Sequence, residues 1–273
     1  MRILLPPSEA KNPGGRGRAL AGRKRRSPLE DAREIVYARL AQLVEGHTGT
    51  DPAVSAAAKA LLLPPTAAQD ALATNRRILS GATLPAIERY SGVVYEGLAQ
   101  ARLSAGARAA ADRDVLIFSG LFGVLCGSDP IPAYRVPAKA NLPGIGVLAT
   151  FWRRRLGDLM APLLGLSRRG QGLVVDLRSS DYAAMWQPGR GEESASRLLT
   201  VRVLSTKPDG TLGVISYNSK LAKGKLAAAL LERRATGASV ESADDVAEAW
   251  ASVGGTDVAA CARTVGVGLD LID

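Results

Sequence analysis

Hydrophobic positions follow a helical spacing in the first third of the chain and gather into short apolar runs in the rest. Residues 28–43, 51–63 and 66–79 carry apolar side chains every three to four positions, which predicts three helices. Runs that predict strands lie at residues 3–5, 115–118, 173–177, 199–204, 213–216 and 264–267. Because helical and extended segments interleave after residue 115, we predict a single α/β domain in which helices surround a mixed sheet.

Local signals place some boundaries of these elements. Ser27 with Glu30 and Thr66 with Gln69 have the spacing of capping boxes, which predicts two helix starts. Asp209-Gly210 between two apolar runs predicts a hairpin with antiparallel strands. The 273 residues include 47% hydrophobic side chains and show no break in composition, which favours one packed domain.

The chain is basic, with 35 Lys and Arg against 26 Asp and Glu. Residues 12–27 contain no acidic side chain but six Lys or Arg and four glycines, so we expect a basic, flexible loop there. The formal charge of +9 favours a polyanionic partner such as DNA, because neutralising phosphates releases counterions. Solubility and an arginine-rich coding bias are alternative explanations.

The sequence lacks the residues that several classes of function require. Cys126 and Cys261 lie far apart, and His47 is the only histidine, which argues against a two-histidine metal site and a Ser-His-Asp triad. The sequence has neither a GxxxxGK motif nor a GxGxxG motif after a strand. It also has no signal-peptide core and no run of 18 apolar residues. We therefore expect a cytoplasmic protein without a cofactor, a metal or a membrane span.

Polar side chains follow the expected buried strand at 115–118. The stretch SGLFGVLCGSDPIPAYR, residues 119–135, contains glycines and then Asp129, Tyr134 and Arg135. Glycines after a strand let a ligand approach the backbone, so this layout suits a ligand site at the carboxyl end of a sheet. A tight loop in which Asp129 pairs with Arg135 is the alternative.

Two further strand ends carry polar side chains of a kind that catalysis uses. Lys11 follows the first strand and Tyr182 follows the run at 173–177. If these strands are parallel neighbours, both side chains converge with Asp129, Tyr134 and Arg135 at one edge. Lys11 could then be an amine nucleophile of the Schiff-base kind, with Tyr182 or Tyr95 as a proton donor. Simple capping of loops is the alternative.

The sequence LPGIG at residues 142–146 precedes a helical segment. Gly144 and Gly146 give a turn that leaves helix N–H groups free for a phosphate, and the turn resembles the hairpin of helix-hairpin-helix motifs. Arg153 and Arg154 follow within two turns, and Lys139 precedes the loop. These residues form a candidate DNA contact. A plain loop-to-helix turn is the alternative, and Pro137 leaves little room for a preceding helix.

A second basic segment, SKLAKGKLAAALL at residues 219–231, predicts a helix with Lys220, Lys223 and Lys225 near its start. Three lysines there oppose the helix dipole, and a bound anion such as DNA phosphate would relieve this. Gly224 inside the helix indicates close packing of another element. A solvated lysine face is the alternative.

Five blocks together resemble one family. LLPPSEAK, YSGVVYEGL, SGLFGVLCGSDPIPAY, VVDLRSSDY and SKLAKG occur in the order typical of the YaaA family of bacterial peroxide-stress proteins. The resemblance implies a cytoplasmic stress-response protein of unusual α/β fold that binds DNA through a helix-hairpin-helix-like element and a basic cleft. In the last block, Leu221 replaces a basic residue and Lys223 stands for an arginine.

Two hypotheses follow. The first is a DNA-binding stress protein that contacts the backbone with little sequence specificity. The second is an enzyme that acts on a nucleobase, a nucleotide or a small anionic metabolite in the pocket of Lys11, Asp129, Tyr134, Arg135 and Tyr182.

Overall fold

A mixed β-sheet runs through the protein with the strand order β11-β12-β9-β8-β1-β3-β4, and β10 pairs with β9 outside this path. The computed structural model describes residues 1–22, 27–45, 52–98, 103–165, 172–189, 193–206, 209–254, 257–262 and 267–272. The sheet contains β1 (Arg2–Leu5), β3 (Val115–Ser119), β4 (Gly123–Cys126), β8 (Val174–Asp176), β9 (Leu198–Thr206), β10 (Leu212–Gly213), β11 (Asp257–Ala262) and β12 (Val267–Ile272). Two small two-stranded sheets pair β2 (Leu84–Pro85) with β5 (Pro130–Ile131), and β6 (Asn141–Leu142) with β7 (Gly146–Val147).

The central strands of the sheet are parallel. Leu4 of β1 pairs with Leu116 of β3 on one side and with Asp176 of β8 on the other. Parallel strands are buried on both faces, which explains why β1 and β3 read as continuous apolar runs. The carboxyl ends of β1, β3 and β8 therefore meet at one edge of the sheet, as the second hypothesis requires.

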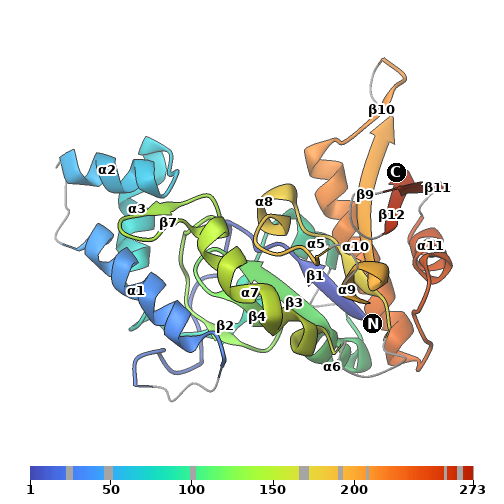
Figure 1. Ribbon diagram of the computed structural model, residues 1–273, viewed down its shortest axis with the longest axis horizontal. Coiled ribbons are helices and arrows are strands. Elements are labelled where there is room, and N and C mark those ends of the chain that lie inside the picture. Colours follow the sequence, from blue (N-terminus) through green and yellow to red (C-terminus); the bar gives the residue numbers. More distant parts are fainter. Residues whose placement is uncertain are drawn as a thin grey trace.

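Helices surround this sheet. They are α1 (Glu30–Val44), α2 (Pro52–Ala60), α3 (Pro65–Arg76), α4 (Ala86–Arg89), α5 (Val93–Leu98), α6 (Ala105–Asp114), α7 (Leu148–Leu164), α8 (Ser180–Ala183), α9 (Glu193–Arg197), α10 (Ser216–Ala235) and α11 (Ala243–Ala251). Figure 1 shows α1, α2 and α3 at one end of the molecule, and β9 to β12 with α10 and α11 at the other. One apolar core links these elements, so the predicted α/β fold with a mixed sheet and surrounding helices is confirmed.

Neither predicted capping box is present, although both helices whose starts they predicted do form. α1 has Leu29 at its N-cap, because the Ser27 hydroxyl accepts from the Leu29 N–H at 3.2 Å and closes a turn ahead of the helix. α3 begins at Pro65, one residue earlier than predicted. Proline suits the first helical turn because its φ is preset and it has no N–H to satisfy.

The predicted hairpin at Asp209 is confirmed. β9 and β10 are antiparallel, and the Asp209 carboxylate accepts from the Thr211 N–H at 2.9 Å. The strand expected at 213–216 is wrong in extent, since β10 ends at Gly213 and α10 begins at Ser216. Of the strand expected at 264–267, residues 264–266 lie outside the described residues.

α10 packs closely on α5, as the glycine inside it indicated. A methyl group on Gly224 would lie 2.6 Å from the Leu98 nitrogen and closer still to the Val94 carbonyl oxygen. On Gly97 it would lie 3.0 Å from the Gly224 Cα. The two helices therefore touch through backbone, and only glycine fits at either position.

The described part of the expected basic loop, residues 12–22, is hydrogen-bonded to other segments of the chain. The buried Arg89 guanidinium donates to the carbonyl oxygens of Asn12 and Gly14, with the second bond at 2.8 Å, and Gly17 pairs with Thr83. Residues 23–26 and His47 lie outside the described residues. No helix in the described ranges has the length and apolar character of a membrane span, and the cytoplasmic location stays a prediction.

Candidate functional site

Lys11 lies in the loop that follows β1, at the carboxyl edge of the sheet. An isolated bridge pairs its backbone with Tyr90. Its Nζ donates to the carbonyl oxygens of Ser8 at 2.8 Å and Glu9 at 3.3 Å. The same nitrogen lies 4.2 Å from the centre of the Tyr134 ring and 5.4 Å from that of Tyr90. The amine is thus held between a backbone turn and two aromatic faces.

Burial shifts the titration of Lys11. Desolvation, together with the positive charge of Arg135 and against the opposing charge of Glu9, lowers the pKa of its ammonium from 10.5 to about 7. About half of the Lys11 side chains therefore carry a neutral amine at neutral pH. A neutral amine has a free electron pair, so it can act as a nucleophile or a base.

A chain of hydroxyl groups lies beneath the amine. The Tyr134 hydroxyl is 2.5 Å from that of Tyr90 and 2.7 Å from the Ser119 Oγ. The Ser119 Oγ accepts from the N–H groups of Leu121 and Phe122, so its own proton is directed at Tyr134. Burial raises the pKa of both tyrosines well above 10, which keeps these phenols protonated.

Arg135 and Tyr182 complete the walls. Arg135 pairs with Glu9 at 2.8 Å, in an ion pair whose carboxylate side chain is 74% exposed. Asn75 fixes the Arg135 backbone by bonding both its N–H and its carbonyl oxygen. Burial raises the pKa of the Tyr182 phenol. The structure therefore brings Lys11, Tyr134, Arg135 and Tyr182 together, as the sequence predicted.

These side chains line a small cavity together with residues 7–9, 61–63, 136 and 137. Its volume of about 20 Å³ holds little more than one water molecule. Leu62 on its wall has a φ of +54° and a side chain that is 57% exposed. It occupies the left-handed position of the turn that ends α2, since Leu62 N–H bonds to Lys59 and Leu63 N–H to Ala58. Glycine is the usual residue at such a position, so the exposed Leu62 at this cavity is an exception to that preference.

The placement of Asp129 in this pocket is wrong. β4 runs antiparallel to β3 and takes the chain back to the opposite edge of the sheet, where Cys126 pairs with Leu116. The Asp129 carboxylate accepts from the Cys126 N–H at 2.9 Å and closes the turn after β4. The alternative pairing of Asp129 with Arg135 is also absent among the described ion pairs, because Arg135 pairs with Glu9.

The carboxyl end of β8 holds two charged groups that no sequence pattern indicated. Arg178 binds Asp176 through two bonds, at 2.8 and 2.7 Å, and both side chains are almost fully buried. Another nitrogen of Arg178 donates to the Trp186 carbonyl oxygen at 3.1 Å. Tyr90 and Ser119 were missed as well, although both lie inside the quoted blocks. Their roles depend on partners far along the chain, so spacing carried no signal for them.

LPGIG forms a β-hairpin between β6 and β7 rather than the turn of a helix-hairpin-helix. Gly144 and Gly146 have φ values of +79° and +75°, and α7 follows directly. The segment ahead of the loop contains a turn and a two-residue strand, so the expected helix-hairpin-helix element is not confirmed. The first N–H groups of α7, those of Leu148 and Ala149, already bond to the carbonyl oxygens of Ala140 and Ala138. These two donors are thus not open to a phosphate.

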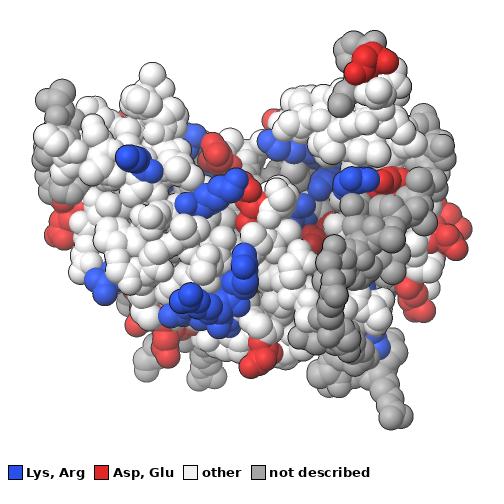
Figure 2. Space-filling view, turned by 45° about the horizontal axis from the view of Figure 1, so that its top comes forward, with Lys and Arg blue, Asp and Glu red and all other residues white. Residues whose placement is uncertain are grey.

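The basic side chains predicted to contact DNA have different surroundings. Lys139 pairs with Asp181 at 2.7 Å, and Arg153 donates to the Ala184 carbonyl oxygen at 2.8 Å. Both of these side chains are exposed, as are Arg154, Lys220 and Lys225. Lys223 instead points inward and donates to the Arg178 carbonyl oxygen at 3.3 Å. Figure 2 shows a hollow between two halves of the surface, with Lys and Arg on both sides of it and acidic residues among them.

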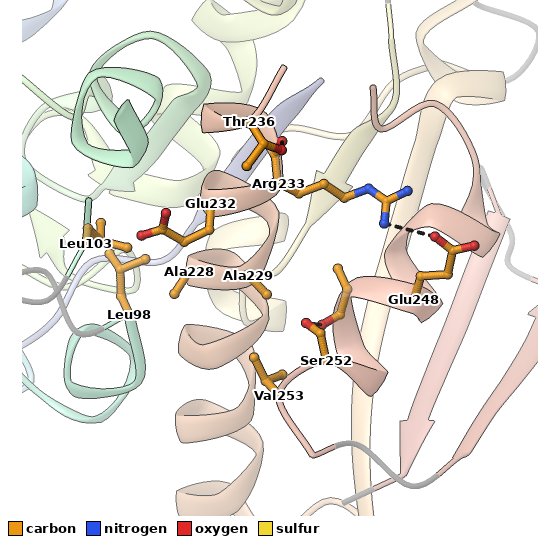
Figure 3. Close-up of a pocket in the computed structure, with 11 residues that line it drawn as sticks. Leu98, Leu103, Ala228, Ala229, Glu232, Arg233, Thr236, Glu248, Ser252 and Val253 are labelled. Carbon is orange, nitrogen blue, oxygen red and sulfur yellow. Dashed lines mark hydrogen bonds and ion pairs between the residues drawn. The ribbon is translucent and has the colours of Figure 1, made fainter. Parts of the chain in front are cut away.

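A wider cavity of about 520 Å³ lies between α10, α11 and the ends of α5 and α6. Figure 3 shows apolar side chains from α10 and from residues 98, 103 and 253 on its walls, with the Arg233–Glu248 ion pair at one side. Glu232 is bound to the N–H and hydroxyl of Ser104, which lowers the pKa of its carboxyl group. The lining of this cavity contains neither a lysine nor a cysteine, so it offers no amine or thiol nucleophile. The smaller cavity has the Lys11 amine. Across the described ranges, no three His, Cys, Asp or Glu side chains gather as a metal site.

Comparison with known proteins identifies relatives across most of the chain. Residues 1–249 match the sequence model of a family described as peroxide stress protein YaaA. A UPF0246 protein of Streptomyces coelicolor is 37% identical over 255 residues, which cover 93% of this chain and 90% of that protein. A UPF0246 protein of Corynebacterium efficiens is 36% identical over 233 residues, or 84% of each chain. One from Porphyromonas gingivalis is 34% identical over 154 residues, 56% of this chain and 59% of the relative.

Proposed function

We propose that this protein, which belongs to the YaaA family of peroxide stress proteins, is an enzyme whose Lys11 amine reacts with the carbonyl group of a small anionic substrate. The observation that carries the proposal is the desolvated Lys11 amine, with a pKa of about 7, on the wall of a cavity at the carboxyl edge of the sheet. Lysines that form imines are activated in this way, by desolvation and by a neighbouring cation. Here Arg135 is that cation.

The reaction needs a neutral amine and a proton donor. The Lys11 Nζ adds to the carbonyl carbon, the carbonyl oxygen takes a proton, and the nitrogen releases one to solvent, which gives a carbinolamine. Loss of water then forms the imine. Tyr182 lines the same cavity, and burial raises the pKa of its phenol, which therefore holds a proton at neutral pH. Its place in the cavity makes it the candidate donor for the carbonyl oxygen.

The rim of the cavity favours an anionic substrate. The Glu9–Arg135 pair is solvated, and exposed pairs of this kind contribute about 0 to 1 kcal/mol. An anionic substrate that passes this rim can therefore displace Glu9 from Arg135 at little cost, which widens the cavity beyond one water. Leu62, held in a left-handed conformation, lines the same cavity.

Reductive trapping tests this proposal. The protein is incubated at pH 7 with glyoxylate, a two-carbon anionic aldehyde, and sodium borohydride, and the modified peptide is identified by mass spectrometry. We expect one dominant adduct on Lys11. Lys11→Arg keeps the charge and loses the adduct, whereas the control Lys59→Arg changes an exposed lysine of α2 and keeps it. Adducts spread evenly over exposed lysines would contradict the proposal.

Contact with DNA is a second candidate function, supported by the basic hollow in Figure 2 and the formal charge of +9. Arg154 and Lys220 are its exposed candidates. Fluorescence anisotropy with labelled duplex and single-stranded DNA at two salt concentrations tests it. Backbone binding predicts a logarithmic salt slope of about 0.9 per phosphate contacted, and a loss of affinity in Arg154→Glu and Lys220→Glu on every sequence. Equal DNA affinity of the variants and the wild type would show that Arg154 and Lys220 do not contact DNA.

A further inference from the structure

Lys223 is a second desolvated lysine at the same edge of the sheet. Its Nζ donates to the Arg178 carbonyl oxygen at 3.3 Å, and burial lowers the pKa of its ammonium while Asp176 partly opposes this. Two of its neighbours on α10, Lys220 and Lys225, point to solvent. Lys223 alone of the three faces the carboxyl end of β8.

The nearest carboxylate is already occupied. Both oxygens of Asp176 bind the guanidinium of Arg178, and one of them also accepts the Arg178 N–H at 3.0 Å. Within the described part of the chain, no carboxylate lies within ion-pair distance of Lys223. A largely buried ammonium with one carbonyl partner is costly, and an oxyanion would offset that cost.

Backbone packing fixes the position of Lys223. The next residue, Gly224, lies against the backbone of Val94 and Leu98 in α5, where no side chain fits. In α5, the Tyr95 hydroxyl donates to the Pro6 carbonyl oxygen at 2.9 Å, in the loop that leads to Lys11. The close contact of the two helices therefore fixes the backbone at Lys223 beside the end of β8.

Short backbone connections link Lys223 to the Lys11 cavity. The Leu177 N–H bonds to the Leu4 carbonyl oxygen at 2.9 Å, so Arg178 directly adjoins the end of β1. Arg178 also donates to the carbonyl oxygen of Tyr182, whose side chain lines the cavity. Residues 178–182 thus contact Lys223 at one end and form a cavity wall at the other.

We infer that Lys223 is an oxyanion-binding residue that receives the phosphate or carboxylate of the substrate whose carbonyl group reacts at Lys11. This inference rests on the proposed function for the identity of the substrate, but the anion site itself is independent of it. It assigns Lys223 to the pocket, in place of the expected contact with the DNA backbone.

The first test measures anion binding without any reaction. The midpoint of thermal unfolding is followed against inorganic phosphate, with sodium chloride at matched ionic strength as the reference. A ligand that binds the folded state raises this midpoint. We expect the rise in the wild type and in Lys225→Gln, an exposed lysine of the same helix, and its loss in Lys223→Gln and Lys223→Met. An unchanged rise in both Lys223 variants would overturn the inference.

The second test compares two aldehydes that differ by one phosphate. Borohydride trapping at Lys11 is measured with glyceraldehyde, with glyceraldehyde 3-phosphate and with glyoxylate, a smaller aldehyde that carries a carboxylate. We expect the half-saturating concentration of the preferred anion to be at least about tenfold below that of glyceraldehyde, and we expect Lys223→Gln to abolish this difference. Trapping without any preference for an anion would contradict the inference alone. The absence of trapping with all three aldehydes would instead contradict the proposed function, and the phosphate titration would still decide on Lys223.

Discussion

Replacing Lys11 by methionine should change how stability depends on pH. The pKa of this lysine is about 7 in the folded protein and 10.5 in the unfolded chain, so the unfolded chain binds more protons between these two values. Stability therefore rises with pH through this window, as the folded protein is relieved of a buried charge. The full difference between these two pKa values corresponds to about 5 kcal/mol of unfolding free energy. About 2 kcal/mol of this is gained between pH 7 and pH 9.

Urea denaturation at pH 7, 8 and 9 measures this contribution. The N-terminal amine of Met1, the thiol of Cys126 and the ammonium of Lys223 also have shifted pKa values, so the quantity to compare is the difference between the wild type and Lys11→Met at each pH. This difference should grow in favour of the wild type by about 2 kcal/mol from pH 7 to pH 9. Lys59→Met, an exposed control, should show no such trend. A constant difference for Lys11→Met would refute the reasoning.

Substitutions at three further positions test the frame around the site. Gly224→Ala should destabilise the protein by about 3 kcal/mol in chemical denaturation, because the new methyl group meets the Val94 carbonyl oxygen and backbone cannot yield as a side chain would. Leu62→Gly should stabilise it by about 1 kcal/mol by relieving a left-handed residue, whereas Leu62→Val should destabilise it; the same sign for both would exclude backbone strain as the cause. Asp176→Asn should cost about 3 to 5 kcal/mol because Arg178 keeps a buried charge without its partner, and a loss below about 1 kcal/mol would show that the pair is solvated.

The sequence predicted the parts of the site that depend on short patterns. Lys11 and Tyr182 follow apolar runs, and because those runs form parallel neighbours β1 and β8, both side chains arrive at one edge. Asp129 follows a similar run but is absent from that edge. The reason is the tight return of the chain into β4 at Gly123, where φ is +75° and a side chain would meet the Trp152 ring at 2.8 Å. This turn depends on a partner in α7, which no local pattern announces.

Long-range partners also explain the other differences. α7 begins where LPGIG predicted a helix, but carbonyl oxygens of residues 138 and 140 occupy its first donors. Lys223 has the same sequence surroundings as Lys220 and Lys225, yet the glycine contact with α5 turns it inward. Hydrophobic periodicity predicts that a helix forms and which elements are buried. It does not predict which polar group of a loop or helix already has a partner.

The titration of Lys11 itself tests the central claim most directly. Competitive labelling of the protein with a trace amount of an amine-reactive anhydride, from pH 5 to pH 11, gives the pH dependence of the reaction at the peptide that contains Lys11. We expect a midpoint near 7, with the amine reactive at neutral pH. A midpoint near 10.5, the ordinary value for lysine, would mean that Lys11 is charged at neutral pH and would contradict its role as a nucleophile.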